Sequence, residues 1–190
     1  MTSARRLIDV SHVVEDGLVT YPGLPGPVVS DYLSRHASES RYSEGTTFQI
    51  GRIEMIANTG TYIDAPFHRF EGGMDIAGLP LERIADLDGL VVDAPGDRAI
   101  GTAPFEGLDL GMRAVLIRTG WDRHWRTPKY AENAPYVTRE LAELLVRANP
   151  ALVGIDSINI DAVEDGARPA HTLLLGAGIP VVEHLRGLDG

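Results

Sequence analysis

The clearest hydrophobic pattern in the chain predicts a helix over residues 138–148. Its apolar side chains recur at spacings of three and four residues, at Leu141, Leu144, Leu145 and Ala148. Thr138 is a natural N-cap, and Asn149 followed by Pro150 is a typical helix end. These signals predict an amphipathic helix that buries one face.

Three mostly apolar segments around this helix are typical of buried strands: Arg113–Arg118, Ala151–Ile155 and Ile179–Val182. A second, shorter helix is expected to begin at Pro169 and to end at Gly176 or Gly178. The resulting order of strand, helix, strand, helix, strand predicts crossover units and a partly parallel sheet.

The first half of the chain favours strands and loops. Alternation predicts strands over Leu7–Val14 and around Phe48–Met55, and a further strand begins at Leu90–Val92. The Pro- and Gly-rich stretch after residue 15 excludes regular structure. Ser30–Gly45 is polar, and we expect a mobile loop or lid there.

Composition narrows the class of protein. With 190 residues and 44% hydrophobic content, residues 1–190 are expected to form a single domain. No apolar run approaches the length of a membrane span and no signal peptide is expected, so we predict a cytoplasmic protein with no membrane partner. The absence of cysteine excludes disulfides and thiol nucleophiles. A net charge of −10 argues against nucleic acid as a partner.

Candidate chemistry begins in the stretch Asn58–His68, NTGTYIDAPFH, which places Asp64 and His68 four residues apart beside Pro66. Taken alone, this pair also fits a turn cap and a solvated loop histidine. The C-terminal part of the chain supplies His171 and Glu183, and these residues favour a functional site over the structural interpretation.

His171 is expected in the first turn of the second helix, where the helix dipole favours a neutral imidazole. Glu183 is expected at the carboxyl end of the last strand. With Asp64 they offer one imidazole and two carboxylates, which suit a divalent cation such as Mn²⁺, Zn²⁺ or Mg²⁺.

Three aromatic residues are candidates for a substrate pocket. Trp121 and Trp125 follow a buried strand, and Tyr21 lies in the Pro- and Gly-rich loop. Packing anchors are an equally good interpretation of the two tryptophans.

Several segments in order resemble the cyclase family, which includes bacterial kynurenine formamidase and isatin hydrolase. They are LIDVSH, NTGTYIDAPFH, LIRTGW, VGIDS and PAH with LLLGAGIPVVE, and they cover nearly the whole chain. The resemblance implies a swivelling β/β/α fold, an α/β class with a mixed sheet and flanking helices. It also implies a homo-oligomer, a dimer or tetramer, that acts on a small-molecule substrate.

The family signature HxGTHxDxPxH carries over unevenly. By resemblance, Asp64 matches the metal-bridging aspartate, His68 the catalytic acid/base, and His171 and Glu183 the remaining ligands. Asn58 and Tyr62 stand where the signature has two histidine ligands, and both are weaker ligands for a transition metal. Three outcomes stay open: one metal, a site in which Asn58 and Tyr62 contact substrate, or no metal.

The favoured outcome is one divalent ion, Mn²⁺ or Zn²⁺, held by Asp64, His171 and Glu183. The expected activity is hydrolysis of a small amide, formamide, lactam or lactone, with His68 as acid/base and Tyr62 as a hydrogen-bond donor to the oxyanion. Asn58, Tyr21, Trp121 and Trp125 are the predicted substrate-binding residues. The alternative is a metal-free cyclase or dehydratase, or a ligand-binding member without catalysis.

Overall fold

The computed structural model describes residues 7–189. The chain divides into two compact units, one formed by residues 13–60 and the other by the residues on either side of that stretch. The single domain expected from the sequence stays a prediction.

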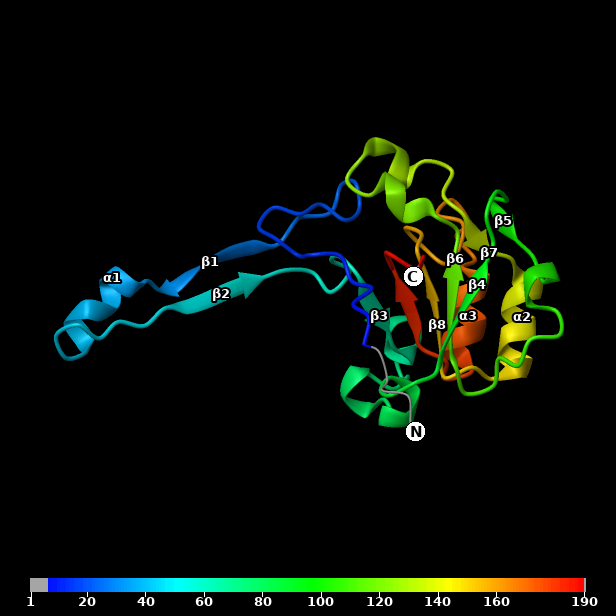
Figure 1. Cartoon of the computed structure of the whole chain (residues 1–190), viewed down its shortest axis with the longest axis horizontal. Coiled ribbons are helices and arrows are strands. Elements are labelled where there is room, and N and C mark those ends of the chain that lie inside the picture. Colours follow the sequence, from blue (N-terminus) through cyan, green and yellow to red (C-terminus); the bar gives the residue numbers. More distant parts are fainter. Residues whose placement is uncertain (1–6, 190) are drawn as a thin grey trace, which may run out of the picture. The chain divides into compact units, whose positions relative to one another are not determined.

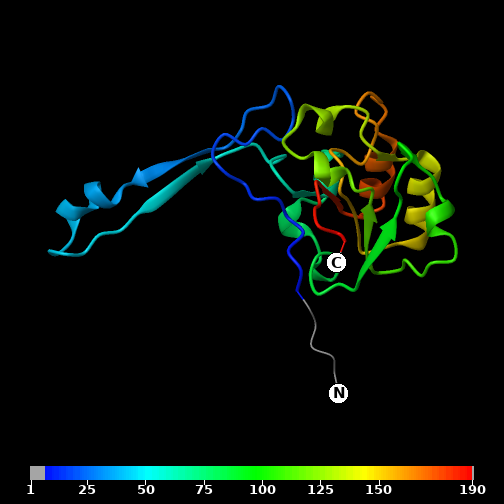
Figure 2. The same ribbon diagram turned by 45° about the horizontal axis from the view of Figure 1, so that its top comes forward.

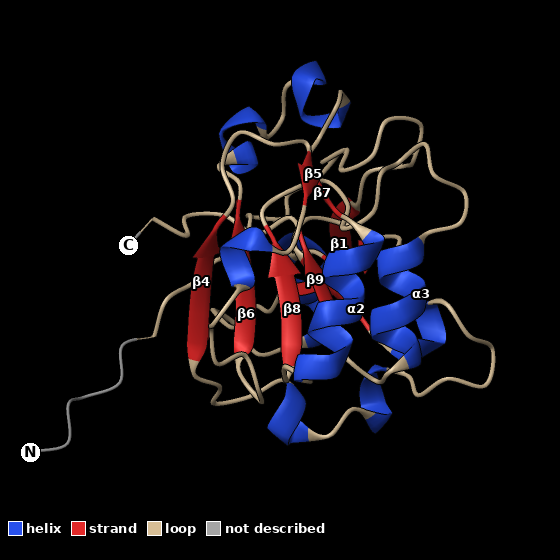
Figure 3. Cartoon of the chain, turned by 90° about the vertical axis from the view of Figure 1, so that its right-hand side faces the viewer, coloured by secondary structure: helices blue, strands red, loops and turns tan. Residues whose placement is uncertain are grey.

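A five-stranded mixed sheet forms the larger unit, with strand order β3-β9-β8-β6-β4 (Figure 3). Its strands are β3 (Tyr62–Asp64), β4 (Gly89–Asp93), β6 (Ala114–Arg118), β8 (Leu152–Ile155) and β9 (Val181–Glu183). Neighbouring strands from β4 to β9 pair in parallel, and β3 pairs antiparallel with β9. The mixed sheet expected from the sequence is confirmed.

Two helices cover one face of this sheet, as Figure 3 shows. Helix α2 (Arg139–Ala148) connects β6 to β8, and α3 (Pro169–Gly176) connects β8 to β9, so both are crossovers between parallel strands. Apolar side chains from both helices and three strands meet in the core: Val115, Ile117, Leu141, Leu145, Val153, Ile155, Leu174, Leu175 and Val181. The predicted crossover order is therefore confirmed.

The ends of α2 agree with the sequence. The Thr138 hydroxyl accepts a hydrogen bond from the Leu141 N–H, and Asn149 adopts the left-handed conformation with φ of 52°. Leu141 and Leu145 are fully buried, whereas Glu140 and Glu143 lie outside the core. The helix therefore begins and ends where its caps predict.

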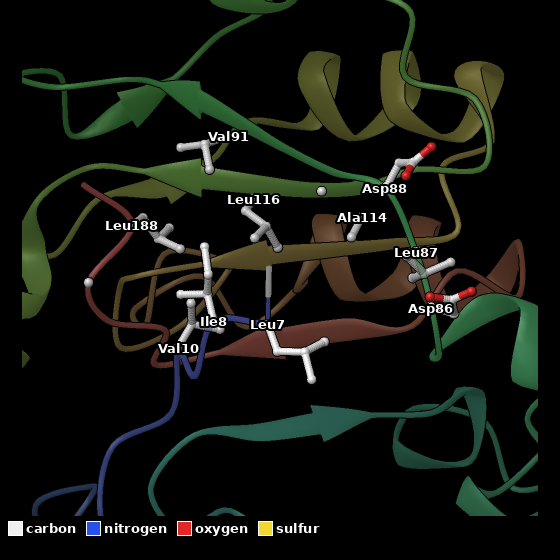
Figure 4. Close-up of a pocket in the computed structure, with 12 residues that line it drawn as sticks. Leu7, Ile8, Val10, Asp86, Leu87, Asp88, Val91, Ala114, Leu116 and Leu188 are labelled. Carbon is white, nitrogen blue, oxygen red and sulfur yellow. The ribbon is translucent and has the colours of Figure 1, made fainter. Parts of the chain in front are cut away.

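The opposite face of the sheet carries a groove of about 520 Å³, shown in Figure 4. Ala114 and Leu116 line it because they alternate along β6 with the core residues Val115 and Ile117. None of the candidate site residues lines this groove.

Residues 7–14 also lie partly along this groove, and the strand predicted there is wrong. The backbone of this segment bonds to isolated partners instead of a neighbouring strand. The Val10 carbonyl accepts the Arg186 N–H, and the His12 N–H donates to the Thr61 hydroxyl. The alternation of apolar and polar residues in this segment therefore does not mark a β-strand, and most of its side chains are exposed.

The larger unit is completed by short elements. Strands β5 (Ala99–Ile100) and β7 (Tyr136–Val137) form a separate parallel pair. The remaining turns are 3₁₀ helices at Pro66–His68, Ile76–Gly78, Leu81–Arg83, Ala103–Phe105, Trp121–His124 and Pro128–Ala131.

Residues 13–60 are built around an antiparallel hairpin of β1 (Val28–Leu33) and β2 (Ile50–Glu54), seen in Figures 1 and 2. Helix α1 (Arg35–Ser38) and a 3₁₀ turn (Glu39–Arg41) lie in the connection between the strands. The strand predicted around Ile50 is confirmed. The loop predicted for Ser30–Gly45 is wrong, because this segment contains most of β1 and the short helix.

Adjacent residue pairs of this hairpin point to opposite faces. Val29 pairs with Ile53 on one face, and Ser30 pairs with Arg52 on the other. Val29 is 47% exposed and Ile53 is 67% exposed, so apolar side chains of this face lie open to solvent.

Among residues 7–189, no helix has both the length and the apolar character needed to cross a bilayer.

Close packing of the sheet can be tested at Gly154, in the middle of β8. A Cβ atom there would lie 2.6 Å from Leu185 Cδ1 and 3.0 Å from Leu116 Cδ2. We therefore expect Gly154→Ala to lower the free energy of unfolding by about 1–3 kcal/mol, measured by urea denaturation. Gly166→Ala, where a Cβ has no neighbour within 4 Å, should change it by no more than about 0.5 kcal/mol. Equal stability of the two variants would contradict this account of the packing.

Candidate metal centre

The register between β3 and β9 determines which side chains face α3. Tyr62 pairs with Glu183, and Asp64 pairs with Val181. Because side chains alternate along a strand and Val181 belongs to the core under the helices, all four point to the same side. The two acidic residues therefore face the helix that carries His171.

Asp64, His68 and His171 form the candidate metal centre. One ligand atom from each lies within 4.8 Å of the others. Asp64 Oδ1 is 3.3 Å from His68 Nδ1, and Asp64 Oδ2 is 3.5 Å from His171 Nε2. The Asp64 and His171 side chains are each 6% exposed, whereas that of His68 is 43% exposed.

Glu183 lies directly beside this set. Its Oε1 is 3.5 Å from His171 Nε2 and accepts a hydrogen bond of 2.7 Å from the Ile160 N–H. Its Oε2 accepts a hydrogen bond of 2.5 Å from the Tyr62 hydroxyl. Burial raises the pKa of Glu183, and the charge of His171 opposes this effect. The structure thus brings Tyr62, Asp64, His68, His171 and Glu183 together, as expected.

The protonation expected for His171 is wrong. Burial favours the neutral ring, but the hydrogen bond to Asp161 and the nearby carboxylates of Asp64 and Glu183 outweigh it and raise the pKa of His171 from 6.5 to about 10. A helix dipole contributes only about 0.3–1 kcal/mol, less than the roughly 1.4 kcal/mol of a single pKa unit. The surrounding carboxylates therefore determine the charge of this ring when no cation is bound.

Asp161 is the site residue that sequence reasoning missed. Its Oδ2 lies 2.7 Å from His171 Nδ1, and hydrogen bonds from His171 lower its own pKa although burial opposes this. The available signal was its place after the buried strand Leu152–Ile155, near the carboxyl edge of the sheet.

Four further residues are predicted to bind substrate. Trp121 donates its indole N–H to the Tyr130 carbonyl, and the Trp125 ring stacks on His12 with centroids 3.9 Å apart. Both tryptophans therefore have packing contacts. Asn58 and Tyr21 belong to the unit of residues 13–60. Substrate binding by these four residues stays a prediction.

A family model described as "Putative cyclase" matches residues 8–162, which is most of the chain. This chain belongs to the cyclase family. The matched range contains Asp64 and His68 and ends before His171 and Glu183.

Relatives of this chain include proteins named kynurenine formamidase. The Bacillus cereus protein is 27% identical over 179 residues, which cover 94% of this chain and 81% of the relative. The Geobacillus thermodenitrificans protein is 29% identical over 187 residues, with the same coverage of both chains.

Solved structures of the family share the fold. A predicted metal-dependent hydrolase from Bacillus stearothermophilus is 25% identical, with a TM-score of 0.70 over 98% of this chain and 85% of its own. Isatin hydrolase A from Labrenzia aggregata is 23% identical, with a TM-score of 0.74 over 97% and 82% of the two chains. The latter similarity supports the cyclase fold alone.

The residues present fit a divalent cation. Asp64 Oδ2 is buried and has no hydrogen-bond partner among residues 7–189, which is costly for a carboxylate oxygen unless a cation compensates it. Imidazole nitrogens and carboxylate oxygens are the ligands that Zn²⁺ and Mn²⁺ accept. The ion's identity stays a prediction.

A second group of rings lies beside this centre. His12, Trp125, Tyr130 and His184 contact one another, and the His184 ring is 5.4 Å from that of Tyr62. Burial lowers the pKa of His184 to about 3, and burial with the charge of Arg186 lowers the pKa of His12 to about 4. Both rings are therefore neutral at pH 7.

His12 gives the fold a dependence on pH with a definite sign. Its pKa is lower in the folded chain than in the unfolded one, so the unfolded chain binds more protons below pH 6.5 and stability falls as pH decreases toward 4. A phenylalanine at position 12 would keep an aromatic ring stacked on Trp125 but would not bind protons. We therefore expect His12→Phe to reduce the slope of the unfolding free energy against pH, between pH 6.5 and 5, by at most about 1.4 kcal/mol per pH unit. Urea titrations of metal-free protein measure this slope, and parallel curves would contradict the assignment.

Proposed function

We propose that this cyclase-family protein is a metal-dependent hydrolase of a small amide, formamide, lactam or lactone, with one divalent ion as cofactor. The observation that carries the proposal is the buried Asp64 Oδ2, which lacks a hydrogen-bond partner among the described residues and lies beside two imidazoles. The names of the relatives, kynurenine formamidase and metal-dependent hydrolase, support the reaction class.

Asp64, His171 and Glu183 would hold the ion. Glu183 accepts hydrogen bonds from the Tyr62 hydroxyl and the Ile160 N–H, which fix its carboxylate beside His171, with Oε1 3.5 Å from His171 Nε2. A bound Mn²⁺ or Zn²⁺ would lower the pKa of a water molecule and polarise the scissile carbonyl.

His68 is the acid/base in this scheme. Its side chain is the most exposed of the three in the centre, so water and substrate can reach the ring, and its Nδ1 lies 3.3 Å from Asp64 Oδ1. The ring accepts a proton from the attacking water and returns it to the leaving nitrogen or oxygen. Tyr62 donates to Glu183 and thereby orients that carboxylate, and reorientation of its hydroxyl would be needed for a bond to the oxyanion.

A metal-free cyclase or dehydratase, or a binding protein, is the second candidate. The observation that favours it is Tyr62 itself, which occupies a ligand position of the family signature and uses its hydroxyl on Glu183. Metal content separates the two candidates.

Loss of the Asp64 charge should remove the ion. We expect about one ion per chain in wild-type protein reconstituted with Mn²⁺ or Zn²⁺, and little in Asp64→Asn, measured by elemental analysis. Asp165→Asn is the matched control, because Asp165 is an exposed carboxylate outside the centre.

His68→Ala should lower turnover of a formamide, lactam or lactone by about 100-fold or more, while the circular dichroism of the folded protein stays unchanged. Wild-type protein without metal would favour the metal-free candidate.

We also propose that the protein is a homo-oligomer in which the hairpin face that carries Val29 and Ile53 packs against a second copy. A two-stranded hairpin is marginally stable by itself in water, and Val29 and Ile53 leave apolar area uncovered. Burial of this face in a dimer would stabilise the strands.

A charge on that face should weaken self-association. Ile53→Asp is expected to shift the mass measured by light scattering after gel filtration toward the monomer. Ser30→Asp adds the same charge to the opposite face and should leave the mass unchanged. A monomeric wild-type protein, or equal masses for both variants, would refute the proposal.

A further inference from the structure

The ring of His171 is held from the side opposite the metal centre. Its Nε2 faces Asp64 and Glu183 at 3.5 Å each, and its Nδ1 faces Asp161 Oδ2 at 2.7 Å. The same Asp161 oxygen accepts the backbone N–H of His171 at 3.0 Å. One oxygen therefore fixes both the backbone and the ring of this histidine.

Asp161 is itself anchored to the start of α3. Its Oδ1 accepts the Ala170 N–H at 2.7 Å, and its side chain is fully buried. Arg168, the residue before the helix, has φ of 47° and makes no side-chain cap bond. The Asp161 carboxylate thus caps the N-terminus of α3, because it accepts the backbone N–H groups of Ala170 and His171 that Arg168 leaves without a side-chain cap.

The loop that carries Asp161 also holds Glu183. Residues 157–161 are all buried, and the Ile160 N–H donates to Glu183 Oε1. The Asn159 side chain accepts the Asp161 N–H at 2.9 Å, which fixes the turn. Neighbouring residues of one loop therefore orient two of the predicted metal ligands.

We propose that Asp161 is a positioning residue that holds a proton of His171 on Nδ1 and keeps Nε2 as the ring nitrogen that faces the metal centre. Asp161 is not assigned as a ligand, because its carboxylate lies on the Nδ1 side of the His171 ring, opposite Asp64 and Glu183. A carboxylate behind an imidazole fixes the tautomer and orientation that a cation requires. The consequence for metal affinity rests on the proposed function, whereas the position of the proton does not.

The position of the proton is measured first in wild-type protein. Nitrogen-15 NMR of the histidine rings, with His171→Gln to assign the signal, should show a slowly exchanging Nδ1–H for His171. This result is expected with or without Zn²⁺. A His171 ring protonated only on Nε2 would overturn the proposal without the need for any variant of Asp161.

The effect of Asp161 on metal binding is measured next, by competition with a chelator. Asp161→Asn should weaken Zn²⁺ or Mn²⁺ binding by about 10- to 100-fold and abolish the protected Nδ1–H signal. Asp165→Asn removes the same charge from an exposed acceptor in the adjoining loop and should change neither value. Circular dichroism verifies that both variants fold.

Other outcomes also decide the question. Unchanged metal affinity in a folded Asp161→Asn protein would overturn the positioning role. Absence of metal from the wild-type protein would overturn the proposed function, and the NMR result would then decide the role of Asp161 alone. Loss of the Nδ1–H signal in Asp161→Asn supports the proposal in that case, and its retention refutes it.

Discussion

The antiparallel pairing of β3 with β9 is the constraint on which the candidate centre depends. Three residue pairs set this register, and it turns Tyr62, Asp64 and Glu183 toward α3. A shift by one residue would direct all three side chains to the other face of the sheet. The crossover through α3 then brings His171 onto the same face, so the chemistry follows from strand register and connection together.

The negative charge of the three carboxylates around His171 needs a nearby positive charge to compensate it. Asp64, Asp161 and Glu183 surround one imidazole, and all four side chains are nearly or fully buried. Without a cation, the proton on His171 supplies the only formal positive charge within this group of four. A divalent ion would replace that proton and offset more of the negative charge, so metal binding and proton release should be linked. The group therefore has an electrostatic reason to bind a cation.

The sequence predicted the second half of the fold well, because local signals there agree with the tertiary structure. Thr138 and Asn149 cap α2 as expected, and β6, β8 and β9 are buried strands at the predicted places. In the first half, alternation was ambiguous. Residues 7–14 alternate but pair with no strand, and the polar composition after Ser30 concealed β1, whose residues are mostly exposed.

For the candidate centre, the motif positions indicated Asp64, His68, His171 and Glu183, and the structure places them together. Three-dimensional proximity was needed for the rest. The contact of Asp161 with His171 spans ten residues of irregular chain, and the charge of His171 depends on carboxylates from three separate segments. Neither follows from local sequence.

The hydrogen bond between the His12 N–H and the Thr61 hydroxyl has a consequence for the way the gene can vary. These two residues lie on either side of the unit formed by residues 13–60, and at 2.9 Å between donor and acceptor they close its two ends together. The entropic cost of closing a loop grows only with the logarithm of its length. A change in the length of a segment whose ends are held together therefore changes this cost little. A change in the length of the hairpin should therefore cost the five-stranded sheet little stability.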